Sequence, residues 1–350
     1  MDNWKNALVH EFTPIREVIQ SIETSGLQIA LVVNDRDVLL GIITDGDIRR
    51  GLLKGISLDE SAHKIMNKNP TVSRGFAGRD ELLALMRYKK IRHIPVVDEE
   101  GRIVELEASD ELKYKEDLAN WVVLMAGGIG SRLQPLTNDC PKPLLKVGGK
   151  PILETILEGL KSYGFKRFYL SVNYKADLIE RYFGNGEKWD VDIRYLREDK
   201  RLGTAGALSL LPELPEHPIL VMNGDLLTKM NFKQLLDFHV EHGSAATMCV
   251  RDYEFQVPYG VAMVEKHKLL GISEKPIHHF FVNAGIYMIN PESIRIIPKN
   301  TYFDMPSLFE LLIQNKDETS VFPIREYWLD IGQMKEYERA NLEFTELFNS

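Results

Sequence analysis

The sequence has few cysteines and no excess of positive charge. Cys140 and Cys249 are the only cysteines in 350 residues. Two are too few for a disulfide framework, and they lack the spacing of a metal site, so we expect a protein of the reducing cytoplasm. The formal net charge is −8. This argues against a nucleic-acid partner, because nucleic-acid-binding proteins hold phosphates with clustered Lys and Arg.

Long hydrophobic runs are also missing. No window approaches 18 uninterrupted apolar residues, and Met1–Lys5 lacks a basic region leading into an apolar run. We therefore expect a soluble, unexported protein with no membrane partner. Apolar residues make up 44% of the chain, which is enough to fill the cores of two or three domains.

A glycine-rich turn follows an apolar run near the middle of the chain. The run 121–126 has the pattern of a strand and leads into Gly127, Gly128 and Gly130. Glycine turns let backbone N–H groups approach phosphate oxygens closely. We therefore expect this turn to hold the phosphates of a nucleotide.

Two commoner phosphate-binding motifs do not fit. A dinucleotide-binding motif that starts at Gly128 and Gly130 needs a third glycine at position 133, which is Leu133. A P-loop needs Gly-Lys followed by Ser or Thr, but here Pro151 follows. Neither hydride transfer nor ATP hydrolysis is indicated.

Two cations accompany the glycine turn. Arg132 lies just after it, and Lys142 lies between Pro141 and Pro143, which restrict its backbone. Fixed cations beside a phosphate cradle indicate chemistry at phosphorus. The alternative is a glycine-rich connection with solvated basic residues.

The first third of the chain contains an internal repeat. Segment 32–40 resembles segment 96–104, an offset of 64 residues, and each copy has the pattern of a strand, an acidic turn and a second strand. Helical patterns precede both copies. The repeat resembles a pair of cystathionine-β-synthase-type (CBS) modules. That resemblance implies an α+β domain that binds adenine nucleotides in its clefts and associates into homo-oligomers.

The ligand motif of that family is present in the first copy. Thr44 and Asp47 supply a hydroxyl and a carboxylate that can bind phosphate and ribose hydroxyls. The second copy departs from the motif, with Glu105, Ala108 and Glu111 at the positions of Gly41, Thr44 and Asp47. We expect a regulatory nucleotide site at Thr44 and Asp47, with a structural or dimerising role as the alternative.

Strand-like and helical runs alternate from residue 121 onward. The strand-like runs are 121–126, 168–173, 193–196 and 219–222, and Pro151 suits the first position of a helix with one apolar face. This alternation predicts an α/β fold with a doubly wound, mostly parallel sheet. Ligands of such sheets bind beyond the carboxyl ends of the strands, where the turns at Gly127 and Asp225 fall.

A charged stretch, residues 111–117, separates the repeat from the first of these strands. We place the domain boundary there. The sequence thus predicts a tandem CBS regulatory domain over residues 1–118 and a catalytic domain over residues 119–350.

Segment 124–144 resembles the signature of sugar-1-phosphate nucleotidyltransferases, and further motifs of that family follow in order to about residue 335. The resemblance implies a Rossmann-like fold, a nucleoside triphosphate and a sugar 1-phosphate as substrates, and Mg²⁺ as cofactor. It implies that Gly127, Gly128 and Gly130 cradle the nucleotide. Arg132 then faces the β- and γ-phosphates, and Lys142 reaches the α-phosphate or the attacking sugar phosphate.

The same resemblance implies the metal ligands. Asp225 lies in an Asn-Gly-Asp turn, and Asp330 lies in a Trp-x-Asp-x-Gly context that ends at Gly332. Both aspartates bind the metal in that family. A lone aspartate after a strand is more often a turn-former or a helix cap.

Three more segments match the family. Segment 198–207 corresponds to the part beside the nucleoside, and segments 273–276 and 282–287 correspond to the sugar pocket. The implied nucleotide-binding residues are Glu198, Gly203 and Thr204, and the implied sugar-phosphate-binding residues are Glu274, Lys275, Asn283 and Gly285. His278 and His279 have no partner at metal spacing, and we expect them in a polar loop.

The form of segment 202–207, Leu-Gly-Thr-Ala-Gly-Ala, resembles guanylyltransferases and favours GTP. A CBS pair before a transferase further resembles the glucosamine-1-phosphate guanylyltransferases of legionaminic acid biosynthesis. Glucosamine 1-phosphate is therefore the first expected sugar substrate, and mannose 1-phosphate is the second. The alternative of another class is a catalytically silent regulatory subunit, which should lack a metal ligand or a phosphate cation. Arg132, Lys142, Asp225 and Asp330 are all present.

Overall fold

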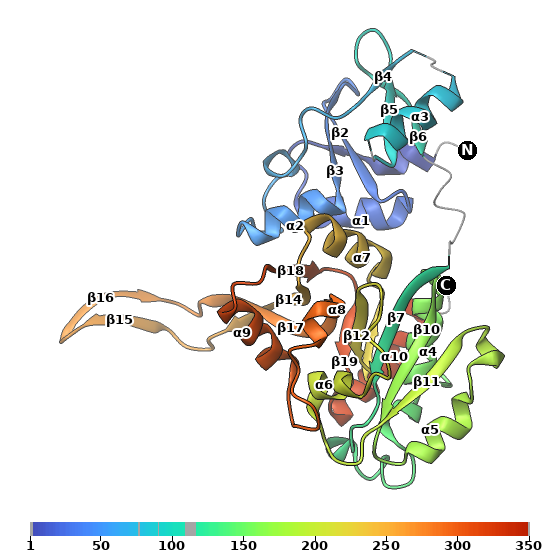
Figure 1. Ribbon diagram of the computed structural model, residues 1–350. Helices are drawn as coiled ribbons and strands as arrows, with labels where there is room; N and C mark the ends of the chain where they lie inside the picture. Colours follow the sequence, from blue (N-terminus) through green and yellow to red (C-terminus); the bar gives the residue numbers. More distant parts are fainter. Residues whose placement is uncertain (1–2, 76–77, 90, 109–116, 349–350) are drawn as a thin grey trace. The chain divides into compact units, whose positions relative to one another are not determined.

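The computed structural model describes residues 3–75, 78–89, 91–108 and 117–348, and contacts divide the chain into two units, residues 1–114 and 115–350 (Figure 1). The predicted linker, residues 111–117, lies outside the described residues except for Asp117. The predicted boundary after residue 118 stays a prediction. No helix of the described residues is long and apolar enough to cross a membrane.

The N-terminal unit is built from two copies of one motif. Its described strands form two three-stranded sheets, ordered β1-β2-β3 and β4-β5-β6. The elements are η1 (Asn3–Ala7), β1 (Leu8–His10), α1 (Ile15–Ser25), β2 (Ile29–Val33), β3 (Leu39–Thr44), α2 (Asp45–Leu53), η2 (Ala62–Lys64), β4 (Ser73–Arg74), α3 (Arg79–Lys89), β5 (His93–Val97) and β6 (Ile103–Ala108).

The structure confirms the repeat and its register. Strands β2 and β5 begin 64 residues apart, as do β3 and β6. The pairing between the second and third strand of each sheet is interrupted at Val32/Val33 in one copy and at Val96/Val97 in the other. The two copies therefore share their irregularities as well as their strands.

The second unit contains a seven-stranded sheet ordered β11-β10-β7-β12-β17-β14-β18. Its strands are β7 (Leu118–Met125), β10 (Phe165–Val172), β11 (Asp192–Arg197), β12 (Ile219–Asn223), β14 (Ala246–Gln256), β17 (Ile277–Ile289) and β18 (Thr319–Ile324). Strands β11, β10, β7 and β12 are parallel, and β17 runs antiparallel to both of its neighbours. The predicted strands are confirmed, with bounds shifted by at most three residues.

Shorter elements complete this unit. The paired short strands are β8 (Lys146–Val147) with β9 (Lys150–Pro151), β13 (Leu226–Thr228) with β19 (Trp328–Asp330), and β15 (Val261–Glu265) with β16 (Lys268–Ser273). The helices are η4 (Ser131–Leu133), η5 (Lys142–Leu144), α4 (Ile152–Ser162), α5 (Ala176–Phe183), η6 (Glu187–Trp189), α6 (Gly203–Gly206), η7 (Ala207–Leu210), α7 (Phe232–His242), α8 (Pro291–Ile294), α9 (Met305–Gln314) and α10 (Met334–Phe348).

Helices cover both faces of this sheet, as a doubly wound fold requires (Figure 1). Side chains alternate between the two faces along each strand. On β7, Val122 and Leu124 pack into the core that α4, α5, α7 and α10 cover, while Val123 packs into the core beneath α8 and α9. The expected mostly parallel α/β architecture is therefore present.

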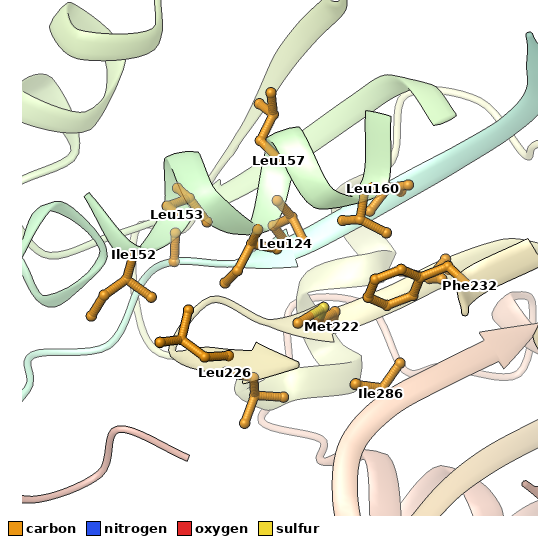
Figure 2. Close-up of a cluster of buried hydrophobic side chains, with 14 of the residues drawn as sticks. Leu124, Ile152, Leu153, Leu157, Leu160, Met222, Leu226, Phe232 and Ile286 are labelled. Atoms are coloured by element: carbon orange, nitrogen blue, oxygen red, sulfur yellow. The ribbon is translucent and has the colours of Figure 1, made fainter. Parts of the chain in front are cut away.

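Helix α4 lies over the strand that leads to the glycine turn. Its apolar face consists of Ile152, Leu153, Ile156, Leu157 and Leu160, all buried. Figure 2 shows part of this face against Leu124, Met222 and Ile286 of the sheet. Pro151 is the N-cap of α4 rather than its first helical residue.

The outer parts of β14 and β17 leave the sheet together and continue into the β15–β16 hairpin, which projects from the unit (Figure 1). We name residues 252–281 the β arm. At the base of the arm, β14 and β17 pair antiparallel, from Asp252 with Phe281 to Gln256 with Ile277.

Candidate active site

A cleft of about 390 Å³ opens at the carboxyl ends of β7 and β12. Both turns that the sequence singled out contribute to it. The residues that line it are Met125, Gly127, Gly128, Glu198, Arg201, Gly203, Thr204, Asn223, Asp225, Tyr302 and Asp304. The topology explains why, because parallel strands end at the same edge of a sheet.

The glycine turn forms one wall of the cleft. A Cβ atom at Gly127 would lie 3.2 Å from Glu198 Oε1, so a side chain there would press on the opposite wall. At Gly128 a Cβ would meet no atom within 4 Å, so its backbone is open. Gly130 has φ of 69° and is the N-cap of η4, the turn that carries Arg132. The backbone of this turn is thus accessible to a ligand from the cleft.

The two cations lie near the two predicted metal ligands. Lys142 is almost buried, with 9% of its side chain exposed, and its ammonium forms an ion pair with Asp225 Oδ2. The guanidinium nitrogens of Arg132 lie 3.6 Å from the position of a Cβ on Gly332, next to Asp330. Both positive charges oppose protonation of Asp330. The structure therefore brings the predicted catalytic and metal residues together.

The two aspartates are held side by side by a short strand pair. Leu226 of β13 pairs with Asp330 of β19, and the amide of Ile331 donates to the carbonyl of Asp225 at 3.0 Å. Part of the surface of Asp330 is exposed to solvent. Even so, burial raises its pKa above the ordinary 3.8, and the negative charge of Asp225 raises it further.

This donor set fits a divalent cation. Asp225 Oδ1 is buried and has no hydrogen-bond partner among the described residues. A buried carboxylate oxygen left without a partner is costly, and two neighbouring carboxylates oppose each other's ionisation. A hard cation with oxygen ligands satisfies both conditions, since Mg²⁺ is usually bound by one or two carboxylates plus phosphates and water.

The far wall of the cleft is built around Glu198. Ser171 Oγ donates to Glu198 Oε1 at 2.6 Å, and the amide of Leu202 donates to Glu198 Oε2 at 2.9 Å. Asn173 Nδ2 donates to the Glu198 carbonyl at 2.6 Å. The carboxylate of Glu198 therefore holds the segment that leads to Gly203 in place.

Asp304 anchors this wall and is not among the residues predicted from the sequence. The amide of Thr204 donates to Asp304 Oδ1 at 3.1 Å, and Tyr302 donates its hydroxyl hydrogen to Asp304 Oδ2 at 2.5 Å. Gly203 has φ of 79°, and a Cβ there would lie 2.6 Å from Asp304 Oδ1. A local signal exists, because Asp304 is the N-cap of α9 and precedes an apolar run with proline in the first turn.

The four predicted sugar-phosphate residues fall into two groups. Gly285 adjoins the cleft, since a Cβ on it would lie 2.6 Å from Asn223 Nδ2. Asn283 Oδ1 accepts a hydrogen bond from the Gly285 amide at 2.9 Å. Glu274 and Lys275 lie on the β arm instead and are not among the residues that line the cleft.

The prediction for His278 and His279 is wrong. Both lie on strand β17 rather than in a loop. His279 Nδ1 is 3.3 Å from Asp252 Oδ2 and 4.0 Å from Glu254 Oε1. The carboxylates come from β14, far away in sequence, which is why local spacing did not reveal them. An exposed group of this kind does not by itself indicate a metal site.

In the N-terminal unit, Thr44 and Asp47 are bonded to each other. The amide and hydroxyl of Thr44 donate to Asp47 Oδ2 at 2.8 and 2.6 Å, forming a capping box at the start of α2. Arg50 donates to Asp47 Oδ1 at 2.7 Å. The groups predicted to bind a nucleotide thus already stabilise a helix terminus.

Comparison with known proteins agrees with this geometry. Residues 121–346 match the nucleotidyl transferase family, and residues 5–54 and 62–105 match the CBS domain. A mannose-1-phosphate guanyltransferase of Candida albicans is 32% identical over 61% of this chain and 62% of its own length. The catalytic subunit beta of mannose-1-phosphate guanylyltransferase from Drosophila melanogaster is 34% identical over 61% of this chain and 60% of its own. The chain thus spans about three fifths of the length of these relatives.

Two solved structures share the fold. HddC from Yersinia pseudotuberculosis, complexed with GMP-PN, superposes with a TM-score of 0.51 at 26% identity, covering 64% of this chain and 99% of that one. A putative glucose-1-phosphate thymidylyltransferase from Bacillus anthracis superposes with a TM-score of 0.52 at 21% identity, covering 63% and 93%. The chain belongs to the nucleotidyl transferase family and carries CBS domains in its N-terminal unit.

Proposed function

We propose that this chain transfers a nucleotidyl group from a nucleoside triphosphate to a sugar 1-phosphate. An oxygen of the sugar phosphate attacks the α-phosphorus, a new oxygen–phosphorus bond forms, and the bond to the β-phosphate breaks. The products are a nucleotide sugar and pyrophosphate. Catalysis of such a step rests mainly on positioning and on neutralising charge.

Each residue has a task in this proposal. The glycine turn at Gly127 and Gly128 offers backbone donors to the phosphates. Arg132 binds the β- and γ-phosphates and the departing pyrophosphate, for which a guanidinium fork is suited. Lys142 neutralises charge at the α-phosphate or on the attacking sugar phosphate. Asp225 and Asp330 hold Mg²⁺, which neutralises charge on the phosphates when it is bound.

One observation carries the proposal. Oδ1 of Asp225 is buried without a partner among the described residues, and it lies beside Asp330 at a cleft walled by a glycine turn. The alternative, a glycine-rich connection with solvated basic residues, does not explain why one carboxylate oxygen is buried and a second carboxylate lies next to it.

GTP and glucosamine 1-phosphate are the proposed substrates. The form of segment 202–207 supports guanine, as do the guanyltransferase names of the relatives and the GMP-PN complex of HddC. The CBS pair before a transferase resembles enzymes of legionaminic acid biosynthesis and favours glucosamine 1-phosphate. Mannose 1-phosphate is the second candidate, because two relatives carry it in their names.

The N-terminal unit is proposed to regulate this activity. CBS pairs bind adenine nucleotides and associate, so we propose an adenylate site at Thr44 and Asp47 and homo-oligomers formed through a domain of residues 1–118. The catalytic domain would then span residues 119–350. A cytoplasmic location is part of the same proposal, since nucleoside triphosphates are available there and two cysteines are too few for a disulfide framework.

The test is a matrix of pyrophosphate release with Mg²⁺. GTP, CTP, UTP, dTTP and ATP are each paired with the 1-phosphates of glucosamine, N-acetylglucosamine, mannose and glucose. We expect turnover with GTP and glucosamine 1-phosphate. Turnover with another pair would support the proposed reaction but overturn the proposed substrates. Folded protein that is inactive with every pair would favour a silent regulatory subunit.

A further inference from the structure

The β arm exposes a concentration of apolar side chains. Half of the large apolar side chains that are exposed among the described residues lie within residues 253–281. Tyr253 is 54% exposed, Tyr259 75% and Ile272 65%. Contiguous exposed apolar surface on a soluble unit indicates a binding surface or an aggregation hazard.

The arm also presents strand edges. Strand β18 pairs with β14 only as far as Arg251, and β12 pairs with β17 only as far as Ile286. Beyond those residues, the outer edges of β14 and β17 have no neighbouring strand within the described part of the chain. An apolar ribbon with open edges is a template for pairing with another chain.

Charge is divided along the arm. Its base carries the acidic side chains of Asp252 and Glu254, which are 38% and 66% exposed. Its tip carries Lys266 and Lys268 with one acidic residue, Glu265. The base is therefore negative and the tip is net positive.

We propose that the β arm joins two copies of this chain. The arms lie antiparallel about a two-fold axis, with the lysine tip of each arm against the acidic base of the other. A two-fold interface is formed by the same surface on both copies, so that surface must complement itself. The division of charge along the arm meets this condition, and the middle of the arm, with Tyr259 and the charged side chains of Glu274 and Lys275, lies at the axis.

Two observations favour a second copy over the chain's own cleft as the occupant. Strands β14 and β17 continue from the sheet into the base of the arm, with one irregularity in their pairing at Met248/Val250, so the sheet sets the direction of that base. The arm also has a suitable size. A standard interface uses roughly 20–30 residues on each side, and the arm provides about 30.

The test uses charge reversal in the full chain, followed by sedimentation velocity. The tip variant is Lys266→Glu with Lys268→Glu, and the base variant is Asp252→Lys with Glu254→Lys. Each variant alone places like charges at both contacts. We expect each to lose one association step, so that its mass falls to half that of the wild type. An equimolar mixture restores both contacts and should regain the mass.

Recovery of the mass in the mixture would show that the lost contact is made by the arm and not elsewhere in the chain. A matched control, Lys299→Glu with Lys316→Glu, changes two exposed lysines outside the arm and should sediment as the wild type does. The proposal is overturned by a monomeric wild type, by variants that sediment as the wild type, or by a mixture that regains nothing. A monomeric wild type would instead indicate that the arm closes on its own chain.

A cross-link provides a second readout that does not depend on charge. Tyr259 lies midway along the arm, so its two copies meet near the axis. Tyr259→Cys should form a disulfide-linked dimer under mild oxidation. Leu342→Cys, an equally accessible position on α10 with 81% exposure, should not. Equal cross-linking of the two variants would contradict the arrangement.

Discussion

Lys142 and Asp225 form an ion pair that uses only one oxygen of the carboxylate. The ammonium bonds to Oδ2, and Oδ1 remains buried without a partner among the described residues. Leaving such an acceptor desolvated costs about 1–3 kcal/mol. A bound cation offsets that cost, which makes Asp225 the first residue to test.

Asp225→Asn should lower turnover by about 10²-fold or more, as expected when a group that stabilises charge in the transition state is removed. The substitution removes the charge that pairs with Lys142, so circular dichroism must first establish that the variant folds. Pyrophosphate release gives the rate. Asp317→Asn, an exposed aspartate outside the cleft, is the control and should retain full activity. Near-normal turnover in folded Asp225→Asn would rule out Asp225 as an essential metal ligand.

Asp330→Asn should raise the thermal unfolding midpoint of the metal-free chain at pH 7. Burial and the charge of Asp225 raise the pKa of Asp330 above 3.8, so the folded chain binds this proton more tightly than the unfolded chain. The free energy of unfolding therefore falls as pH rises through the pKa that Asp330 has in the folded chain. Asp330→Asn removes this fall. The gain should shrink toward pH 3.8, where the carboxyl group is increasingly protonated in the unfolded chain as well.

The same variant should no longer respond to Mg²⁺. Added Mg²⁺ should raise the midpoint of the wild type, because a ligand that binds only the folded state stabilises it. It should raise the midpoint of Asp330→Asn much less, and turnover of the variant should fall by about 10²-fold. Equal Mg²⁺ shifts in the two proteins would place the cation elsewhere.

The parts of the fold that depend on local pattern could be predicted. Strand β7 reads as apolar because both of its faces are covered, with Val122 and Val123 in different cores. The repeat was visible because Val32 and Val96 occupy equivalent strands. Asp225 and the glycine turn were predicted to share a sheet edge because parallel strands end together.

Long-range contacts could not be predicted in the same way. Asp304 bonds to Thr204 across 100 positions of the chain, and no local spacing indicates such a contact. Glu274 and Lys275, which match the motif of the sugar pocket, lie on the β arm, and their predicted role in binding the sugar phosphate stays a prediction. The direction of a long hairpin depends on the strands that continue into it, which the motif does not specify.

Gly203→Ala should destabilise the chain more than Gly243→Ala. Both glycines have positive φ, 79° and 60°, a conformation that costs a residue with a Cβ about 1–2 kcal/mol. At Gly243 a Cβ would meet nothing within 4 Å, whereas at Gly203 it would lie 2.6 Å from Asp304 Oδ1. Urea unfolding should show a further loss of about 1 kcal/mol at Gly203. Equal losses of unfolding free energy in the two variants would mean that the cleft wall around Asp304 can shift without an energetic cost.

Thr44→Ala should weaken both helix α2 and adenylate binding. The hydroxyl of Thr44 bonds to Asp47 Oδ2, and loss of an N-cap side chain costs about 0.5–2 kcal/mol. If the same hydroxyl also binds a nucleotide, AMP affinity measured by calorimetry should fall roughly tenfold, the equivalent of one lost hydrogen bond. Ser57→Ala removes a comparable hydroxyl, which accepts from the Asp59 amide at 3.3 Å, and should change neither quantity. Reduced stability with unchanged AMP affinity would assign Thr44 to the capping box alone.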